Sequence, residues 1–154
     1  MLGWGAEPPS ECEPDVLFVY GSLLPGLPRH PLLASAVPLG PGQIPGRLYD
    51  LGDYPGAVEA PDGRVHGEAY RLRDPGLLRR LDDEEGYDPA DEAGSLYVRR
   101  RVPVTLAGGL VIAAWAYLYA GPLARAVPIP SGDWRRHLAD RRTSPNPRAH
   151  RRQA

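Results

Sequence analysis

Lysine is absent from this chain of 154 residues, and all 18 of its basic residues are arginines. The 19 acidic residues leave a formal net charge of −1, which does not indicate a protein that coats nucleic acid. Cysteine is almost absent too, because Cys12 is the only one. A single thiol excludes a disulfide framework within the chain and any metal site built from several cysteines. Cys12 lies in a polar stretch, where we expect an inert, exposed thiol.

Long hydrophobic runs are also lacking. The longest apolar stretch, Leu110 to Ala120, is too short to cross a bilayer, and the first residues show no basic region followed by an apolar run. We therefore expect a cytoplasmic protein with no membrane partner. The sequence leaves the oligomeric state open.

The length of the chain fits a single domain. We expect a flexible leader over residues 1–14, a folded domain over residues 15–135 and a disordered tail rich in arginine and proline over residues 136–154. Residues 135–154 contain seven arginines and no apolar run. Such a segment could touch nucleic acid, but a solubilising tail is the favoured interpretation, so we do not expect a nucleic-acid partner.

What the chain does contain is a series of strand-like segments separated by glycine, proline and aspartate. Asp15 to Tyr20 is apolar after its first residue and rich in β-branched and aromatic side chains, which is typical of a buried strand. Later segments that also resemble strands are Gly42–Leu51, Arg64–Leu72, Leu96–Thr105 and Leu110–Tyr119, with Ala107-Gly108-Gly109 as a hairpin turn between the last two. This pattern favours an α+β fold, namely a small, mostly antiparallel β-barrel flanked by one or two helices.

One clear helix interrupts these strands and ends near residue 85. Asp74 is a natural N-cap, Pro75 suits the first helical position, and Gly86 can take the left-handed conformation that ends a helix. We also expect a short helix within residues 30–36 and one last turn that packs through Trp134.

Glu85, at the end of the clear helix, is a candidate general base. It falls four residues after Leu81 and so continues the face that the leucines turn toward the core. A carboxylate there is partly desolvated and faces the negative end of the helix dipole, and both effects should raise its pKa. A raised pKa suits a general acid or base at neutral pH. Taken alone, the segment is more typical of a solvated helix end, and Glu84 is a rival on geometry.

Gly21 and Ser22 end the first strand and form a candidate binding loop. A loop at the end of a central strand presents backbone N–H groups that no sheet uses, and Gly21 lets a ligand approach the main chain. Such a loop can hold a carboxylate or a developing oxyanion, although an ordinary turn is the commoner meaning of this pattern. Arg29 and His30 could reach a ligand near this loop, or could be exposed loop residues.

Together, these segments resemble the γ-glutamylcyclotransferase-like family, in particular its small bacterial members and the γ-glutamylamine cyclotransferase branch. The resemblance covers about residues 15–135. It consists of motifs in the family's order: Val16-Leu17-Phe18-Val19-Tyr20-Gly21-Ser22-Leu23, Gly46-Arg47-Leu48-Tyr49-Asp50 with Tyr54-Pro55, Val65-His66-Gly67-Glu68-Ala69-Tyr70, Leu81-Asp82 with Glu85-Gly86-Tyr87, Tyr97-Val98-Arg99 with Val102 and Val104, Ala114-Trp115-Ala116-Tyr117, and Gly132-Asp133-Trp134.

The resemblance implies a compact β-barrel flanked by helices, with a pocket lined by the first loop and one catalytic glutamate. Carried over by position, Tyr20, Gly21, Ser22 and Leu23 form the substrate loop. Glu85 is the proton acceptor, because the residue adjoining the glycine is the one that aligns.

The resemblance also implies a reaction in which a γ-glutamyl amine or peptide becomes 5-oxoproline and a free amine. The α-amine of the substrate attacks its own γ-carbonyl, so no metal, cofactor or protein nucleophile is required. The expected partner is therefore a small-molecule γ-glutamyl substrate. Glu85 would take a proton before the attack and return one to the departing nitrogen.

Several other side chains could face the pocket. Tyr117 and Tyr119 share one face of their strand, and Tyr97 and Arg99 share one face of theirs. We expect Tyr119 to contact the substrate, and the further candidates are Tyr87, Tyr97, Arg99 and Tyr117. Packing within the barrel would explain the tyrosines equally well, and a structural ion pair would explain Arg99 equally well.

Two other functions are compatible with the same residues, since a fold does not by itself confer an activity. The chain could be a non-catalytic or differently reacting binder of a small carboxylate metabolite in the same pocket. A weaker hypothesis is nucleic-acid binding through the arginine tail. The sequence does not identify the leaving amine, because the outer wall of the pocket comes from loops such as residues 24–31 and 88–94.

Overall fold

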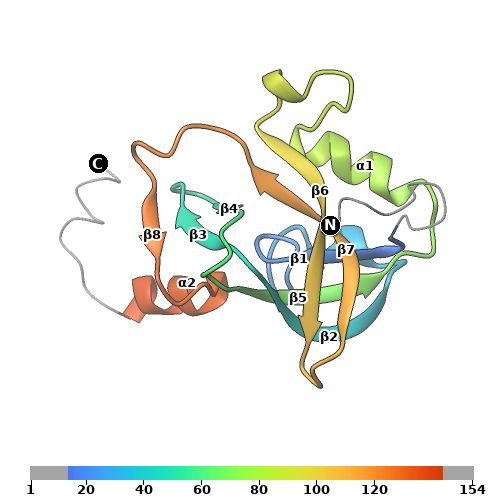
Figure 1. Ribbon diagram of the computed structural model, residues 1–154, viewed down its shortest axis with the longest axis horizontal. Helices are drawn as coiled ribbons and strands as arrows, with labels where there is room; N and C mark the ends of the chain where they lie inside the picture. The colour runs from blue at the N-terminus through green and yellow to red at the C-terminus, as the bar shows by residue number, and fades with distance from the viewer. Residues whose placement is uncertain (1–13, 144–154) are drawn as a thin grey trace.

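The computed structural model describes residues 14–143 (Figure 1). Five strands form a closed barrel in the order β1-β5-β2-β6-β7, and three more form a separate sheet in the order β4-β3-β8. The strands are β1 (Val16–Val19), β2 (Val37–Ile44), β3 (Arg47–Asp50), β4 (Pro55–Val58), β5 (Val65–Arg71), β6 (Tyr97–Leu106), β7 (Val111–Tyr119) and β8 (Val127–Ile129). The helices are α1 (Leu77–Glu85) and α2 (Trp134–Thr143), with 3₁₀ turns at His30–Leu33 and Glu92–Gly94.

The predicted fold class is confirmed, with one refinement of strand direction. Every neighbouring pair in the barrel is antiparallel except β1 and β7, which run parallel where Leu17 pairs with Trp115. The indole Nε1 of Trp115 also donates a hydrogen bond of 3.0 Å to the carbonyl of Pro14. The barrel therefore closes by joining its first strand to its last.

The strand β1 is buried on both faces, which explains its unbroken apolar run. Val16, Phe18 and Tyr20 contribute to one hydrophobic cluster, whereas Leu17 and Val19 contribute to a second. The second cluster also contains leucines of α1, so the helix packs against the outer face of β1. The expected buried strand is confirmed, and it lies between the two cores of the molecule.

The helix α1 ends as predicted but begins later than predicted. Glu85 is its last residue, and Gly86 follows with φ 71°, in the left-handed region. The first helical residue is Leu77 rather than Pro75. Asp74 still caps the turn before it, because its carboxylate accepts from the amide of Gly76 at 2.9 Å.

The segment Gly42–Leu51 is not one strand, and this prediction was wrong. Its first part is the end of β2 in the barrel, and its last part is β3 in the separate sheet. The chain turns between them at Pro45 and Gly46, where proline has no N–H to continue a ladder. The short strands β4 and β8, which pair on either side of β3, were not predicted. The hairpin between β6 and β7 is confirmed, with a bond from the amide of Leu106 to the carbonyl of Leu110.

The helix α2 corrects the expected start of the tail. It continues from Trp134 to Thr143, so residues 136–143 are helical rather than disordered. Asp50 of β3 accepts from His137 at 2.8 Å and from Arg141 at 3.2 Å, and these bonds fasten α2 to the smaller sheet. Figure 1 shows α2 beside this sheet and α1 beside the barrel, at opposite ends of the molecule. Residues 1–13 of the expected leader (1–14) and residues 144–154 of the expected tail (136–154) lie outside the described residues.

No helix within residues 14–143 combines the length and the apolar character needed to cross a membrane.

Candidate active site

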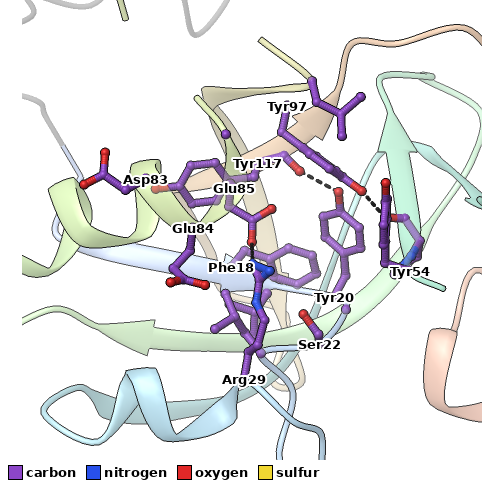
Figure 2. Close-up of a pocket in the computed structure, with 16 residues that line it drawn as sticks. Phe18, Tyr20, Ser22, Arg29, Tyr54, Asp83, Glu84, Glu85, Tyr97 and Tyr117 are labelled. Carbon is purple, nitrogen blue, oxygen red and sulfur yellow. Dashed lines mark hydrogen bonds and ion pairs between the residues drawn. The ribbon is translucent and has the colours of Figure 1, made fainter. Parts of the chain in front are cut away.

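A cavity of about 340 Å³ opens where the loop after β1, the end of α1 and the strands β6 and β7 meet (Figure 2). Segments far apart in the sequence build it, and each contributes only a few side chains. Its lining consists of Phe18, Val19, Tyr20, Gly21, Ser22, Leu23, Arg29, Tyr54, Pro55, Asp83, Glu84, Glu85, Gly86, Leu96, Tyr97 and Tyr117. The predicted loop and the predicted base therefore share one cavity.

Glu85 points into this cavity, and its side chain retains only 13% of its exposure. The Leu81 side chain one turn earlier is fully buried, so the face that buries the leucines also turns Glu85 inward. Burial raises the pKa of the Glu85 carboxyl, while the charge and hydrogen bond of Arg29 act in the opposite direction and the charge of Glu84 adds to the rise. Glu84 itself is exposed, which makes it the weaker candidate for a buried base.

Arg29 forms an ion pair with Glu85 that sequence reasoning did not identify. Its Nη2 donates to Oε2 of Glu85 at 2.6 Å. Its backbone amide donates to the carbonyl of Ser22 at 2.9 Å, so the segment that carries Arg29 folds back onto the candidate loop. Its Nε is buried and has no hydrogen-bond partner among the residues that the structure describes. Next to it, His30 turns away from the cavity and its Nδ1 lies 2.9 Å from the carbonyl of Leu23.

The loop Gly21–Leu23 offers backbone donors at the edge of the cavity. Within residues 14–143, the amides of Gly21, Ser22 and Leu23 have no acceptor. A side chain at position 21 would not fit, because a Cβ there would lie 2.9 Å from Cγ of Pro55. The glycine therefore lets this loop pack closely against the β4 strand while its amides stay available.

Two tyrosines line the cavity but have hydroxyls already committed to the main chain. Tyr20 donates to the carbonyl of Tyr117 and accepts from the amide of Ala57 at 3.2 Å. Tyr97 donates to the carbonyl of Pro55 at 2.6 Å. Desolvation by burial is the main cause that raises the pKa of both phenols, so both stay protonated at neutral pH. Each can offer a ligand its ring but has little hydrogen-bonding capacity left.

Asp82 binds two of the predicted site residues, Arg99 and Tyr117, in a structural network. Nε of Arg99 donates to Oδ1 of Asp82 at 2.9 Å and Nη2 donates to Oδ2 at 3.2 Å, a bidentate pair. The hydroxyl of Tyr117 donates to the same carboxylate at 2.6 Å. The Arg99 guanidinium also lies 4.6 Å from the ring centre of Trp115. This network fixes the last turn of α1 on β6 and β7, one turn before Glu85.

Three predicted contacts lie outside the cavity lining. Arg99 forms the ion pair with Asp82, which is the structural role given above as the alternative to substrate contact. Tyr87 donates its hydroxyl to Glu92 at 2.8 Å, in the segment after α1. Tyr119 was expected to contact the substrate, but its hydroxyl donates to Pro122 at 3.1 Å and its ring packs edge-on against Tyr97. Tyr119 thus supports a wall of the cavity from behind.

No group of three or more histidine, cysteine, aspartate or glutamate side chains gathers as a metal site in the part of the chain from residue 14 to residue 143.

A family model, curated relatives and solved structures match this chain. Residues 17–136 match the model of the family described as gamma-glutamyl cyclotransferase, AIG2-like. The gamma-glutamylcyclotransferase family protein YtfP of Escherichia coli K12 is 36% identical over 119 residues, which covers 77% of this chain and 94% of that protein. The solution structure of Escherichia coli ytfP superposes with a TM-score of 0.56 at 37% identity, over 77% of this chain and 95% of that one. A mouse AIG2-like protein superposes with a TM-score of 0.57 at 27% identity, over 69% and 77% of the two chains.

Proposed function

Because this chain belongs to the gamma-glutamyl cyclotransferase, AIG2-like family, we propose that it converts a γ-glutamyl amine or peptide to 5-oxoproline and a free amine. The narrower proposal is a γ-glutamylamine substrate. One observation supports the reaction above all others: a mostly buried carboxylate, Glu85, faces the same cavity as a loop whose amides have no acceptor in the described structure.

The reaction needs little from the protein except shape and a proton carrier. The α-nitrogen of the glutamyl group forms a bond to the carbon of the γ-carbonyl group, and the bond from that carbonyl carbon to the outer nitrogen breaks. A cavity that folds the glutamyl chain so that these atoms meet can contribute up to about 7–11 kcal/mol through orientation. Phe18, Tyr20 and Tyr97 are buried residues of the lining, and their packed rings would impose such a fold.

Glu85 carries the protons in this scheme. The α-amine is protonated at neutral pH, so a base must remove a proton before the nitrogen can attack. Glu85 takes that proton and then returns one to the departing nitrogen, which leaves as the free amine. Its partial burial makes the carboxylate more basic, and this favours proton uptake.

The loop Gly21–Leu23 supplies hydrogen-bond donors. As the ring closes, the γ-carbonyl oxygen gains negative charge, and a preorganised amide stabilises such an oxyanion by about 3–4 kcal/mol. The substrate's α-carboxylate is the other anion that these amides could bind.

Replacing Glu85 with glutamine tests the proposal. Glu85→Gln keeps the shape of the side chain but removes the base, so release of 5-oxoproline from a panel of γ-glutamyl amines and peptides should fall by about 100-fold or more. Glu59→Gln is the matched control, since this glutamate is exposed and lies outside the cavity lining, and it should stay near the wild-type rate. Unchanged turnover in Glu85→Gln would remove Glu85 from the mechanism.

A second candidate function is binding without turnover. The ion pair between Arg29 and Glu85 occupies the proposed base in the free protein, which is compatible with a pocket that only holds a small carboxylate metabolite. Calorimetric binding of a γ-glutamyl compound with no release of 5-oxoproline would favour this function.

A further inference from the structure

Arg29 is the only basic side chain in the lining of the cavity, as far as residues 14–143 define it. One of its three guanidinium nitrogens, Nη2, is paired with Glu85. Nη1 has no acceptor in the described residues, and Nε is buried without one. A guanidinium has five N–H donors, so most of the hydrogen-bonding capacity of Arg29 is unused.

The position of Arg29 is determined by the candidate loop rather than by Glu85 alone. Its amide bonds to Ser22, and Figure 2 shows its side chain rising past Ser22 toward Glu85. Arg29 is therefore bonded to the proposed base through its side chain and to the proposed substrate loop through its main chain. The pair of Arg99 with Asp82, by contrast, uses two nitrogens on both carboxylate oxygens.

We propose that Arg29 binds the α-carboxylate of the glutamyl group through Nη1, the unused nitrogen that is not buried, while Nη2 stays on Glu85. This assignment rests on the proposed function, and it adds a substrate-binding residue to it. The α-carboxylate and the α-amine are attached to the same carbon atom of the substrate. Holding the carboxylate on Arg29 therefore brings the amine next to the carboxylate of Glu85, which must deprotonate it.

The assignment also separates two roles that the loop amides could otherwise share. If Arg29 binds the α-carboxylate, the amides of Gly21–Leu23 are left for the γ-carbonyl oxygen. The two anions of the reaction are then bound by different groups, one charged and one made of main-chain dipoles. Arg29 in this position selects substrates with a free α-carboxylate and disfavours those in which it is amidated.

The experiment compares two ligands that differ only in this charge. Binding of 5-oxoproline and of its carboxamide is measured by calorimetry on the full chain, and 5-oxoproline release from γ-glutamyl compounds is assayed in parallel. In the wild-type protein the acid should bind about 10- to 100-fold more tightly than the amide, as expected for hydrogen bonds between charged groups. In Arg29→Gln the two ligands should bind about equally.

Two further variants keep the test decisive. Arg29→Lys keeps the charge without the planar fork, so part of the preference for the acid should remain. Arg80→Gln is the matched control, because Arg80 pairs with Asp74 on the surface and lies outside the cavity lining, and it should keep the full preference.

The outcomes distinguish this inference from the proposed function. A protein that prefers the acid, loses this preference in Arg29→Gln and releases no 5-oxoproline would retain Arg29 as the carboxylate site and overturn the reaction. A protein that is active, but in which Arg29→Gln keeps the preference for the acid, would overturn the role of Arg29 alone. Equal binding of acid and amide by the wild-type protein, or no binding of either, would also overturn that role.

Discussion

Glu85 is placed where a negative charge is disfavoured, and this is the main chemical feature of the molecule at the scale of single residues. It ends a helix, its side chain is mostly buried, and the neighbouring Glu84 adds a second negative charge. Only Arg29 offsets these effects within the described residues. The carboxylate is therefore a stronger base than an exposed glutamate, and Arg29 limits how much stronger.

The pH dependence of the reaction should reflect this balance. Glu85 acts as a base only when ionised, so kcat/KM should fall as the pH falls through its pKa. Because burial raises that pKa, the fall should begin at a higher pH than for an exposed glutamate. Arg29→Gln removes the cation that lowers the pKa, so the acidic limb should move to still higher pH. The profile is measured on the wild-type protein and on this variant, and a limb that does not move would show that Arg29 does not influence the base.

Glu85 was predictable from sequence, whereas its partner was not. The leucine spacing of one helix is a local pattern, and it correctly placed position 85 on the inward face. Arg29 belongs to a loop whose course depends on Gly26, at φ 85°, and on the bond from its own amide to Ser22. The only signal was that Arg29 and His30 follow the loop closely enough along the chain to reach a ligand there. Strand periodicity could not show that Tyr119 lies outside the cavity lining, because it gives the face of a residue but not the acceptor that its hydroxyl finds.

At the scale of elements, the last turn of α1 decides where Glu85 points. The Asp82 network holds this turn against β6 and β7, and Gly86 ends the helix directly after Glu85. The amide of Tyr87 bonds back to the carbonyl of Asp82 at 2.9 Å, which closes the helix end. The direction of Glu85 thus depends on contacts of its neighbours more than on its own.

Replacing Gly86 should disturb this helix end. A non-glycine residue at φ 71° costs about 1–2 kcal/mol, and no atom near the new Cβ would add a clash. The free energy of unfolding of Gly86→Ala, measured in urea, should therefore be about 1 kcal/mol lower than that of the wild-type protein. The variant should also lose more activity than this loss of stability explains, because the end of α1 must shift to relieve the strain.

The matched control for this variant is Gly108→Ala in the hairpin between β6 and β7. A Cβ there also meets nothing, and Gly108 does not have the left-handed φ of Gly86. Equal losses of stability in the two variants would show that the backbone of Gly86 is not the cause.

Strong local patterns made the long elements predictable, and tertiary contacts decided the rest. The barrel strands β1, β5, β6 and β7 and the helix α1 were found because their hydrophobic patterns are clear, whereas only the end of β2 fell within a predicted strand. β4 and β8 are short and contain proline, so they gain their pairing from β3 rather than from propensity. The helix α2 is held by bonds from His137 and Arg141 to Asp50, which lies in a strand far away in the sequence, so no local pattern indicated them.

At the scale of the whole molecule, two tyrosine hydroxyls connect the barrel to the smaller sheet behind the cavity. Tyr20 on the barrel side accepts from Ala57 of β4, and Tyr97 of β6 donates to Pro55 of β4. Close packing supplements these bonds, since a Cβ at Gly56 would lie 2.7 Å from Cβ of Tyr119. The cavity wall at Tyr54 and Pro55 is held in place by these contacts.

Removing one of these hydroxyls should loosen the connection. Tyr20→Phe leaves the amide of Ala57 buried without a partner, which costs about 1–3 kcal/mol of unfolding free energy. Tyr49→Phe in β3 is the control, because no hydrogen bond of its hydroxyl is found within the described residues, and it should cost much less. Both are measured by urea denaturation, and equal losses would contradict the role of the Tyr20 hydroxyl.

The parallel contact between β1 and β7 has a consequence for how the protein folds during its synthesis on the ribosome. Synthesis delivers the loop after β1 first and Glu85 later, but the seam at Leu17 and Trp115 cannot form until the nascent chain has emerged past β7. Such a delay between distant segments slows assembly and leaves early strands exposed in the meantime. A truncated chain that stops before β7 would contain the Gly21–Leu23 loop and the Glu85 carboxylate, but it would lack the strand that closes the barrel and brings them together.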